Sequence, residues 1–106
     1  MNKAPTDHFS LNKNINYQEG SVVSKEVFKN KSGTVTLFAF AQGQGLSEHK
    51  TPFEALVYII DGEAEITISG TKNLVKAGEM IRMPAGSLHA LKANKQFKMM
   101  LTMLKD

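Results

Sequence analysis

The sequence predicts an all-β protein, built as a sandwich or barrel of short strands. Three observations lead to this prediction: short runs of β-type residues recur along the chain, turn residues separate them, and no segment carries a helical hydrophobic period. The chain has 106 residues, of which 42% are hydrophobic, which is enough for one domain with a single core. Any binding pocket must therefore belong to this one domain.

The N-terminal residues differ from the rest of the chain. Residues 1–16 are polar, rich in Asn and Lys and without hydrophobic period, so we expect an arm that is ordered only where Phe9 or Leu11 meets a surface. Residues 17–106 are predicted to form the single barrel domain.

The first half of the barrel begins with runs at 21–28 and 34–40, joined by a turn at 30–33. After a Gly-rich loop comes ALVYII (55–60), which is apolar on both faces and so must be covered on both sides, by strand 21–28 or by a second subunit. The following EAEITI (63–68) alternates strictly, as a half-buried strand does. Asp61-Gly62 between the two runs predicts a type I′ hairpin.

The second half continues the same pattern. Ser69-Gly70 predicts a turn, and the run at 80–83 must end at Pro84, which cannot donate to a ladder. A short run follows after Gly86, and the last strand is predicted at 97–104. Pattern alone leaves immunoglobulin-like, jelly-roll and lipocalin-like arrangements open.

Composition excludes several classes of function. The chain has no cysteine, which rules out disulfides, thiolate metal sites and a cysteine nucleophile, so any metal must be held by nitrogen and oxygen. The net charge of +3 comes from scattered lysines rather than one basic stripe, so no nucleic-acid partner is expected. No stretch approaches the ~18 consecutive apolar residues of a membrane span, and we expect a cytoplasmic protein without a membrane partner.

Two segments carry a recognisable pattern. GEMIRMPAGSLH (78–89) reads G-x5-P-x-G-x2-H, and the segment from Gly43 to Gly62 reads G-x5-H-x-T-x10-G. Together they resemble the two motifs of the cupin superfamily, small double-stranded β-helix (jelly-roll) barrels. The resemblance spans residues 33–104 and is closest to short single-domain cupins. It implies a jelly-roll barrel and a homodimer.

The resemblance also implies a metal site, of which this chain keeps only part. In the family pattern, two histidines and a glutamate of the first motif and a histidine of the second bind one divalent transition metal (Zn, Ni, Mn or Fe). His49 and His89 match the first and last ligands, while Thr51 and Ala55 stand where the other two should be. A neutral hydroxyl is a poor ligand for these metals, so the site is degenerate.

Glu54 offers a replacement carboxylate. Facing inward, it would complete a set of two histidines and one carboxylate with His49 and His89. Strand parity places it outward when Ala55 faces inward, but Pro52 can introduce a bulge that resets the count.

Two functional hypotheses follow. The first is a small-molecule-binding cupin, with a sensing or accessory role, whose ligand lies between His49, Thr51 and His89; the methionines and aromatics would line an adaptable apolar pocket. The alternative is a metal-dependent oxygenase, isomerase or lyase that uses His49 and His89 with Glu54 or water. Whether the chain is an enzyme, and which residues would be catalytic, the sequence leaves open, since His89 can equally be a neutral core histidine.

Overall fold

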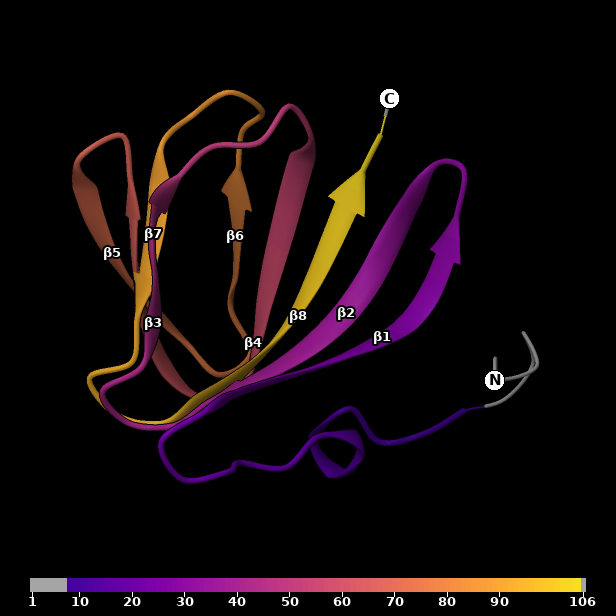
Figure 1. Ribbon diagram of the computed structural model, residues 1–106, viewed down its shortest axis with the longest axis vertical. Helices are drawn as coiled ribbons and strands as arrows, with labels where there is room; N and C mark the ends of the chain where they lie inside the picture. Colours follow the sequence, from indigo (N-terminus) through magenta and orange to yellow (C-terminus); the bar gives the residue numbers. More distant parts are fainter. Residues whose placement is uncertain (1–7, 106) are drawn as a thin grey trace.

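Eight antiparallel strands and one short 3-10 helix make up the protein in a computed structural model that describes residues 8–105. The strands form a single curled sheet in the order β1-β2-β8-β4-β7-β3, with β5 and β6 also paired to β4. The sheet folds over on itself into two layers that face each other, a double-stranded β-helix (Figure 1). In chain order the elements are η1 (Asn12–Asn14), β1 (Val22–Asn30), β2 (Gly33–Phe40), β3 (Gly45–His49), β4 (Glu54–Ile68), β5 (Thr71–Lys76), β6 (Met80–Met83), β7 (His89–Lys92) and β8 (Phe97–Leu104).

β4 belongs to both layers. Its first half pairs with β8 and β6, and its second half pairs with β5 and β7. The hairpin predicted at Asp61-Gly62 is wrong, because these residues continue the β4–β8 ladder opposite Lys98 and Phe97. A register shift between Ile59 and Asp61 marks a bulge where the strand bends from one layer to the other.

Gly62 makes this bend possible. It has a φ of +78°, which L residues with a side chain rarely adopt. A Cβ at this position would also collide with the carbonyl oxygen of Gln96. The same Asp-Gly signal that favours a hairpin therefore marks a bend inside a continuous strand, just after the bulge.

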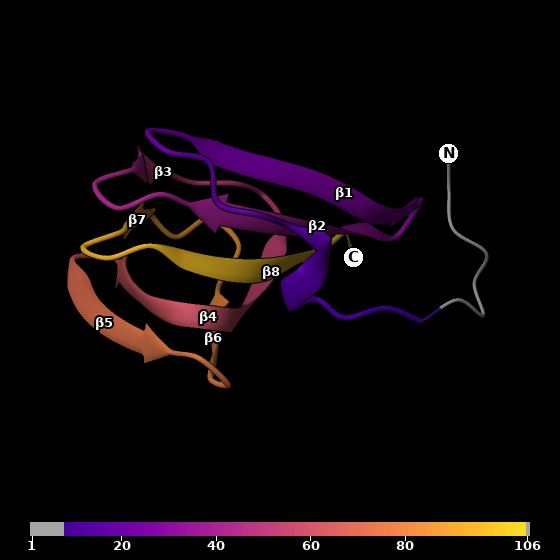
Figure 2. The same cartoon turned by 90° about the horizontal axis from the view of Figure 1, so that it is seen from below.

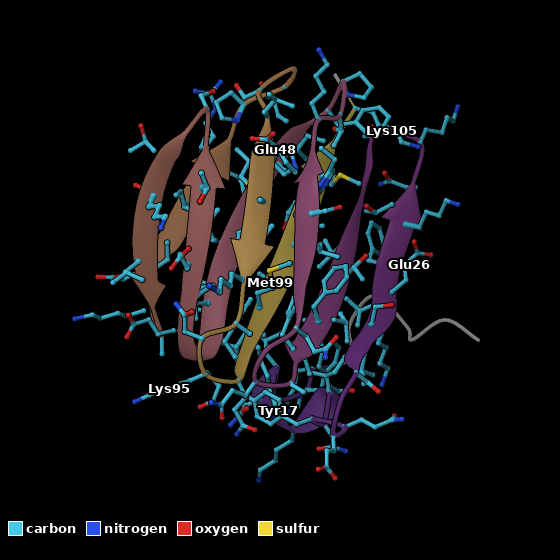
Figure 3. The ribbon with its side chains drawn as sticks, turned by 60° about the vertical axis from the view of Figure 1, so that its left-hand side comes forward. Tyr17, Glu26, Glu48, Lys95, Met99 and Lys105 are labelled. Carbon is cyan, nitrogen blue, oxygen red and sulfur yellow. The ribbon has the colours of Figure 1, made fainter. Side chains whose placement is uncertain are left out.

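The main core lies between the two layers. It is built from alternate, inward-facing residues of each strand, and its largest fully buried side chains include Phe40, Phe97, Ile59, Ile66 and Met99. Figure 3 shows Met99 between the layers. Alternation also explains β2, in which Phe38 and Phe40 pack in this core while Leu37 and Ala39 face the opposite side of the sheet.

The N-terminal segment, residues 8–21 before β1, covers part of that opposite side. Ile15, only 4% exposed, packs with Leu37 and Ala39 in a second cluster that Leu11 and Ile60 border. The cover expected from strand 21–28 is wrong, because β1 pairs edge to edge with β2 and extends the sheet. Figures 1 and 2 place the segment at the end of the sheet where β4 bends.

Polar contacts tie the same segment down. The ammonium of Lys98, a residue only 7% exposed, donates to the Asn12 carbonyl oxygen at 2.7 Å and to Asn12 Oδ1 at 2.9 Å. The Tyr17 hydroxyl donates to Asp61 Oδ2 at 2.5 Å, and the Lys98 ammonium lies 5.1 Å from the centre of the Tyr17 ring. No helix within residues 8–105 has the length and apolar character to cross a membrane.

Candidate functional site

The two histidines singled out by the sequence lie side by side. His49 ends β3 and His89 begins β7, and the two residues are cross-strand partners in an antiparallel ladder. Their ring centres are 4.4 Å apart, with the planes at 72°, an edge-to-face contact. His89 is 4% exposed, whereas His49 is exposed. One imidazole is therefore buried in the barrel, and the other lies exposed beside it.

The pair lies at the end of the molecule opposite the N-terminal segment. The β3–β4 loop (residues 50–53) and the β6–β7 loop (residues 84–88) both cross this end, from one layer to the other (Figure 1). Glu48, next to His49, is at the upper end in Figure 3, and Tyr17 is at the lower end. On the facing layer, the inner residues at this end are Met103, Ala55 and Met83, which are paired across β8, β4 and β6. An apolar wall with two thioethers thus stands across from the imidazoles.

Each imidazole is held by a backbone carbonyl two residues before it. His49 Nδ1 lies 2.7 Å from the Ser47 oxygen, and His89 Nδ1 lies 3.2 Å from the Ser87 oxygen. A carbonyl oxygen can only accept, so each Nδ1 carries the proton that is donated. In the neutral ring this leaves Nε2 with its lone pair. Both histidines therefore offer Nε2 as an acceptor or a metal-binding atom.

The environment keeps His89 neutral. Burial lowers the pKa of His89, the nearby His49 lowers it further, and the hydrogen bond to the Ser87 carbonyl opposes the shift in part. Burial acts in this direction because it penalises the charged imidazolium. At neutral pH the buried ring is thus an uncharged group.

Thr51 makes local hydrogen bonds in the loop that follows β3. β3 ends at His49, so Thr51 lies in the loop and strand parity does not apply to it. Its Oγ1 accepts a hydrogen bond from the Phe53 amide at 2.9 Å, and its carbonyl oxygen accepts one from the Gly86 amide at 2.8 Å. Its hydroxyl completes a local turn, and its main chain ties the two loops together.

Glu54 is directed away from the histidines, toward β6. Glu54 Oε1 accepts from Arg82 Nε at 2.7 Å, and Oε2 accepts from the Ala85 amide at 2.9 Å. The Arg82 hydrogen bond, followed by that of Ala85, lowers the pKa of the Glu54 carboxyl. Ala55, which is 2% exposed, is the inward-facing residue. Strand parity therefore holds at the start of β4: Ala55 faces inward and Glu54 outward, and no bulge before Ala55 reverses them.

The donor set does not fit the four-ligand metal site of the resemblance. Within residues 8–105, no three His, Cys, Asp or Glu side chains gather closely enough to hold a metal ion. Two imidazoles remain, because the Thr51 hydroxyl and the Glu54 carboxylate have other partners and Ala55 has no coordinating atom.

Sequence reasoning missed the residues that support this site. The carbonyls of Ser47 and Ser87 carry no signal in a sequence, because every residue has one. Arg82 did carry a signal: with Ala55 and Met83 facing inward, Glu54 and Arg82 both face outward from neighbouring strands.

The fold and the site define a class of protein: a small double-stranded β-helix barrel with paired imidazoles at one end. The chain belongs to the cupin family, since the cupin domain model (Cupin_2) matches residues 36–104. A search of curated proteins gave no match.

Solved structures resemble the whole chain. A conserved protein of unknown function from Streptococcus pyogenes is 31% identical, with a TM-score of 0.91 over 100% of this chain and 93% of the other. A cupin superfamily protein from Desulfitobacterium hafniense is 28% identical, with a TM-score of 0.90 over 100% and 97%. A cupin 2 conserved barrel domain protein from Leptotrichia buccalis is 37% identical, with a TM-score of 0.88 over 92% of this chain and 47% of its own.

Proposed function

We propose that this cupin binds a small organic ligand through Nε2 of His49 and Nε2 of His89. The observation that carries the proposal is the 4.4 Å approach of the two rings at one end of the barrel, with each Nδ1 held by a backbone carbonyl. Fixing both tautomers in this way leaves two acceptor atoms available without any rearrangement.

The surroundings suggest what kind of ligand fits. Neutral imidazoles accept hydrogen bonds at Nε2, so the polar end of the ligand should carry a donor, such as a hydroxyl or an N–H group. The facing wall of Met83, Ala55 and Met103 suits an apolar remainder, and thioether side chains adapt to its shape. Small-molecule sites commonly combine an apolar lining with a few polar groups of this kind.

A metal-dependent oxygenase, isomerase or lyase is the alternative. The two free Nε2 atoms favour it, since zinc, nickel, manganese and iron all bind imidazole. The partners of Thr51 and Glu54 weigh against it, because water would have to fill the remaining coordination positions. We therefore assign no catalytic step.

Imidazole ¹⁵N NMR tests the proposed binding of a hydrogen-bond donor. Butanol, butylamine and butyrate share an apolar body and differ in the polar end, and His8, an exposed histidine, serves as an internal reference. We expect the alcohol or the amine to shift the resonances of His49 and His89 but not of His8, and His49→Ala to abolish the effect on His89. If neither donor shifts either ring in folded protein, the proposed binding is wrong.

Elemental analysis tests the alternative directly. The protein would be purified without chelators and without a metal-affinity tag. Close to one equivalent of a transition metal, lost in His49→Ala and in His89→Ala, would favour the metal-dependent enzyme over the binding protein.

The homodimer implied by the family is part of the proposal. Phe28, Met80 and Leu104 are 54%, 58% and 45% exposed. By strand parity all three lie on the outer face of the layer formed by β1, β2, β8, β4 and β6, the face that the N-terminal segment covers only in part. Large apolar side chains exposed on one face favour that face as a protein contact surface.

A further inference from the structure

The two loops next to the histidines are joined by hydrogen bonds. Residues 50–53 connect His49 to Glu54, the first residue of β4, and residues 84–88 precede His89. Successive amides of the second loop donate to the first: Ala85 N–H to Glu54 Oε2 at 2.9 Å, and Gly86 N–H to the Thr51 carbonyl oxygen at 2.8 Å. The two motifs therefore meet through their backbones as well as through their imidazoles.

Glu54 has the central place among these hydrogen bonds. Its carboxylate spans from β4 to two neighbouring sites, the Arg82 guanidinium on β6 and the Ala85 amide just beyond it. The Ala85 amide has no other acceptor in residues 8–105. The next two amides, of Gly86 and Ser87, donate to the carbonyl oxygens of Thr51 and Pro84. Without Glu54, the Pro84–Leu88 loop would lose its hydrogen bond to the first residue of β4.

The acceptor of His89 lies in this loop. The Ser87 carbonyl oxygen is 3.2 Å from His89 Nδ1, near the long end of the range for an N–H···O hydrogen bond. A small displacement of Ser87 would therefore release the imidazole from its Nδ1–H tautomer. Ser47, the corresponding acceptor of His49, is closer at 2.7 Å and lies on β3.

We infer that Glu54 is a positioning residue for the histidine pair. Its carboxylate holds the Ala85 amide, the amide fixes the 84–88 loop, and the loop presents the Ser87 carbonyl that sets the tautomer of His89. Its importance for binding rests on the proposed function, whereas its effect on the ring does not. A plain surface ion pair would do less, because the side chains of Arg82 and Glu54 are 63% and 40% exposed and such pairs stabilise little.

Four variants isolate the contact. Glu54→Ala removes both hydrogen bonds, Glu54→Gln keeps an amide oxygen that can accept from Ala85, and Arg82→Ala removes only the ion pair. Glu65→Ala is the matched control, since Glu65 lies in the same strand and accepts from Asn94 Nδ2 at 3.0 Å in an equally exposed contact.

The readout is the imidazole ¹⁵N spectrum of His89, recorded without ligand. We expect a dominant Nδ1–H tautomer in the wild type, Glu54→Gln, Arg82→Ala and Glu65→Ala, and a mixture of tautomers in Glu54→Ala. An unchanged His89 spectrum in folded Glu54→Ala would overturn the inference. An equal change in Glu65→Ala would do the same, because it would show a general loosening of the barrel.

The wild type provides a measurement that needs no variant. The Ala85 amide lies in an exposed loop, so its hydrogen exchange should be at least about tenfold slower than for an unprotected amide if Glu54 holds it. Exchange at the unprotected rate would contradict this hydrogen bond. Both measurements are independent of ligand, so their failure leaves the proposed binding standing, and an absence of binding leaves them unaffected.

Discussion

The Tyr17 hydroxyl donates a hydrogen bond to Asp61, and this contact joins the N-terminal segment to the bend of β4. Burial, together with the Asp61 carboxylate, raises the pKa of Tyr17 well above its ordinary value. The hydroxyl therefore stays protonated and keeps donating at any physiological pH.

Removing that hydroxyl should loosen the segment. We expect Tyr17→Phe to lower the free energy of unfolding by about 1 kcal/mol, the typical net contribution of one hydrogen bond at a partly exposed site. Urea denaturation measures this change in the free energy of unfolding. Tyr58→Phe is the control, because the Tyr58 hydroxyl makes no hydrogen bond within residues 8–105. Equal losses in both variants would show that the Asp61 contact contributes nothing specific.

Two glycines with similar backbones should respond differently to alanine. Gly62 (φ +78°) and Gly70 (φ +83°) both lie in the left-handed region, which costs alanine about 1 to 2 kcal/mol. A Cβ at Gly70 meets nothing within 4 Å, whereas at Gly62 it meets the Gln96 carbonyl oxygen. We expect Gly62→Ala to cost about 3 kcal/mol or more. Similar thermal denaturation of the two variants would contradict the close approach of the Gln96 carbonyl oxygen to Gly62.

Stability should fall on acidification through the range in which His89 titrates. Burial lowers the pKa of His89 from 6.5 in the folded chain. Below pH 6.5 the unfolded chain therefore binds a proton that the folded chain refuses, so the free energy of unfolding decreases as pH falls toward the folded pKa.

His89→Asn should flatten that dependence, because asparagine does not titrate. Urea denaturation at pH 7.5 and pH 5.5 compares the variant with the wild type, and His8→Asn, at an exposed histidine, serves as the control. Equal slopes in His89→Asn and the wild type would mean that other groups cause the acid sensitivity.

The exposed apolar side chains on the outer face predict self-association. We expect a dimer in sedimentation velocity at micromolar concentration, and Phe28→Ser together with Leu104→Ser should shift the population to monomer. Leu74, which is 59% exposed on β5, gives a control at Leu74→Ser that should leave the dimer intact. A monomeric wild type would remove the homodimer from the proposal.

Much of the fold follows from residue pattern. The last strand is predicted at the residues where β8 is found, and the turn predicted at Ser69-Gly70 is present, with a positive φ angle at both residues. The motif spacing predicted that His49 and His89 would meet, which their ring contact bears out. These features depend on short-range backbone preferences or on a pattern shared by a family.

The remaining features depend on partners far away in the chain. Asp61-Gly62 is compatible with a hairpin or with a bend inside a continuous strand, and only the presence of β8 alongside decides between them. Lys98 follows the apolar Phe97 in a strand and gives no local sign that Asn12 will receive its ammonium. The side-chain partner of Glu54 was equally open until β6 and its arginine were in place.

The continuity of β4 through both layers has a mechanical consequence. Neither layer can separate from the other without breaking the hydrogen bonds of the same fifteen-residue strand. Loss of one half would leave the other without its central member, so intermediate states with only one layer folded should not accumulate. The barrel should unfold in a single cooperative step, so heat or denaturant should separate the two histidines at the same midpoint at which the core unfolds.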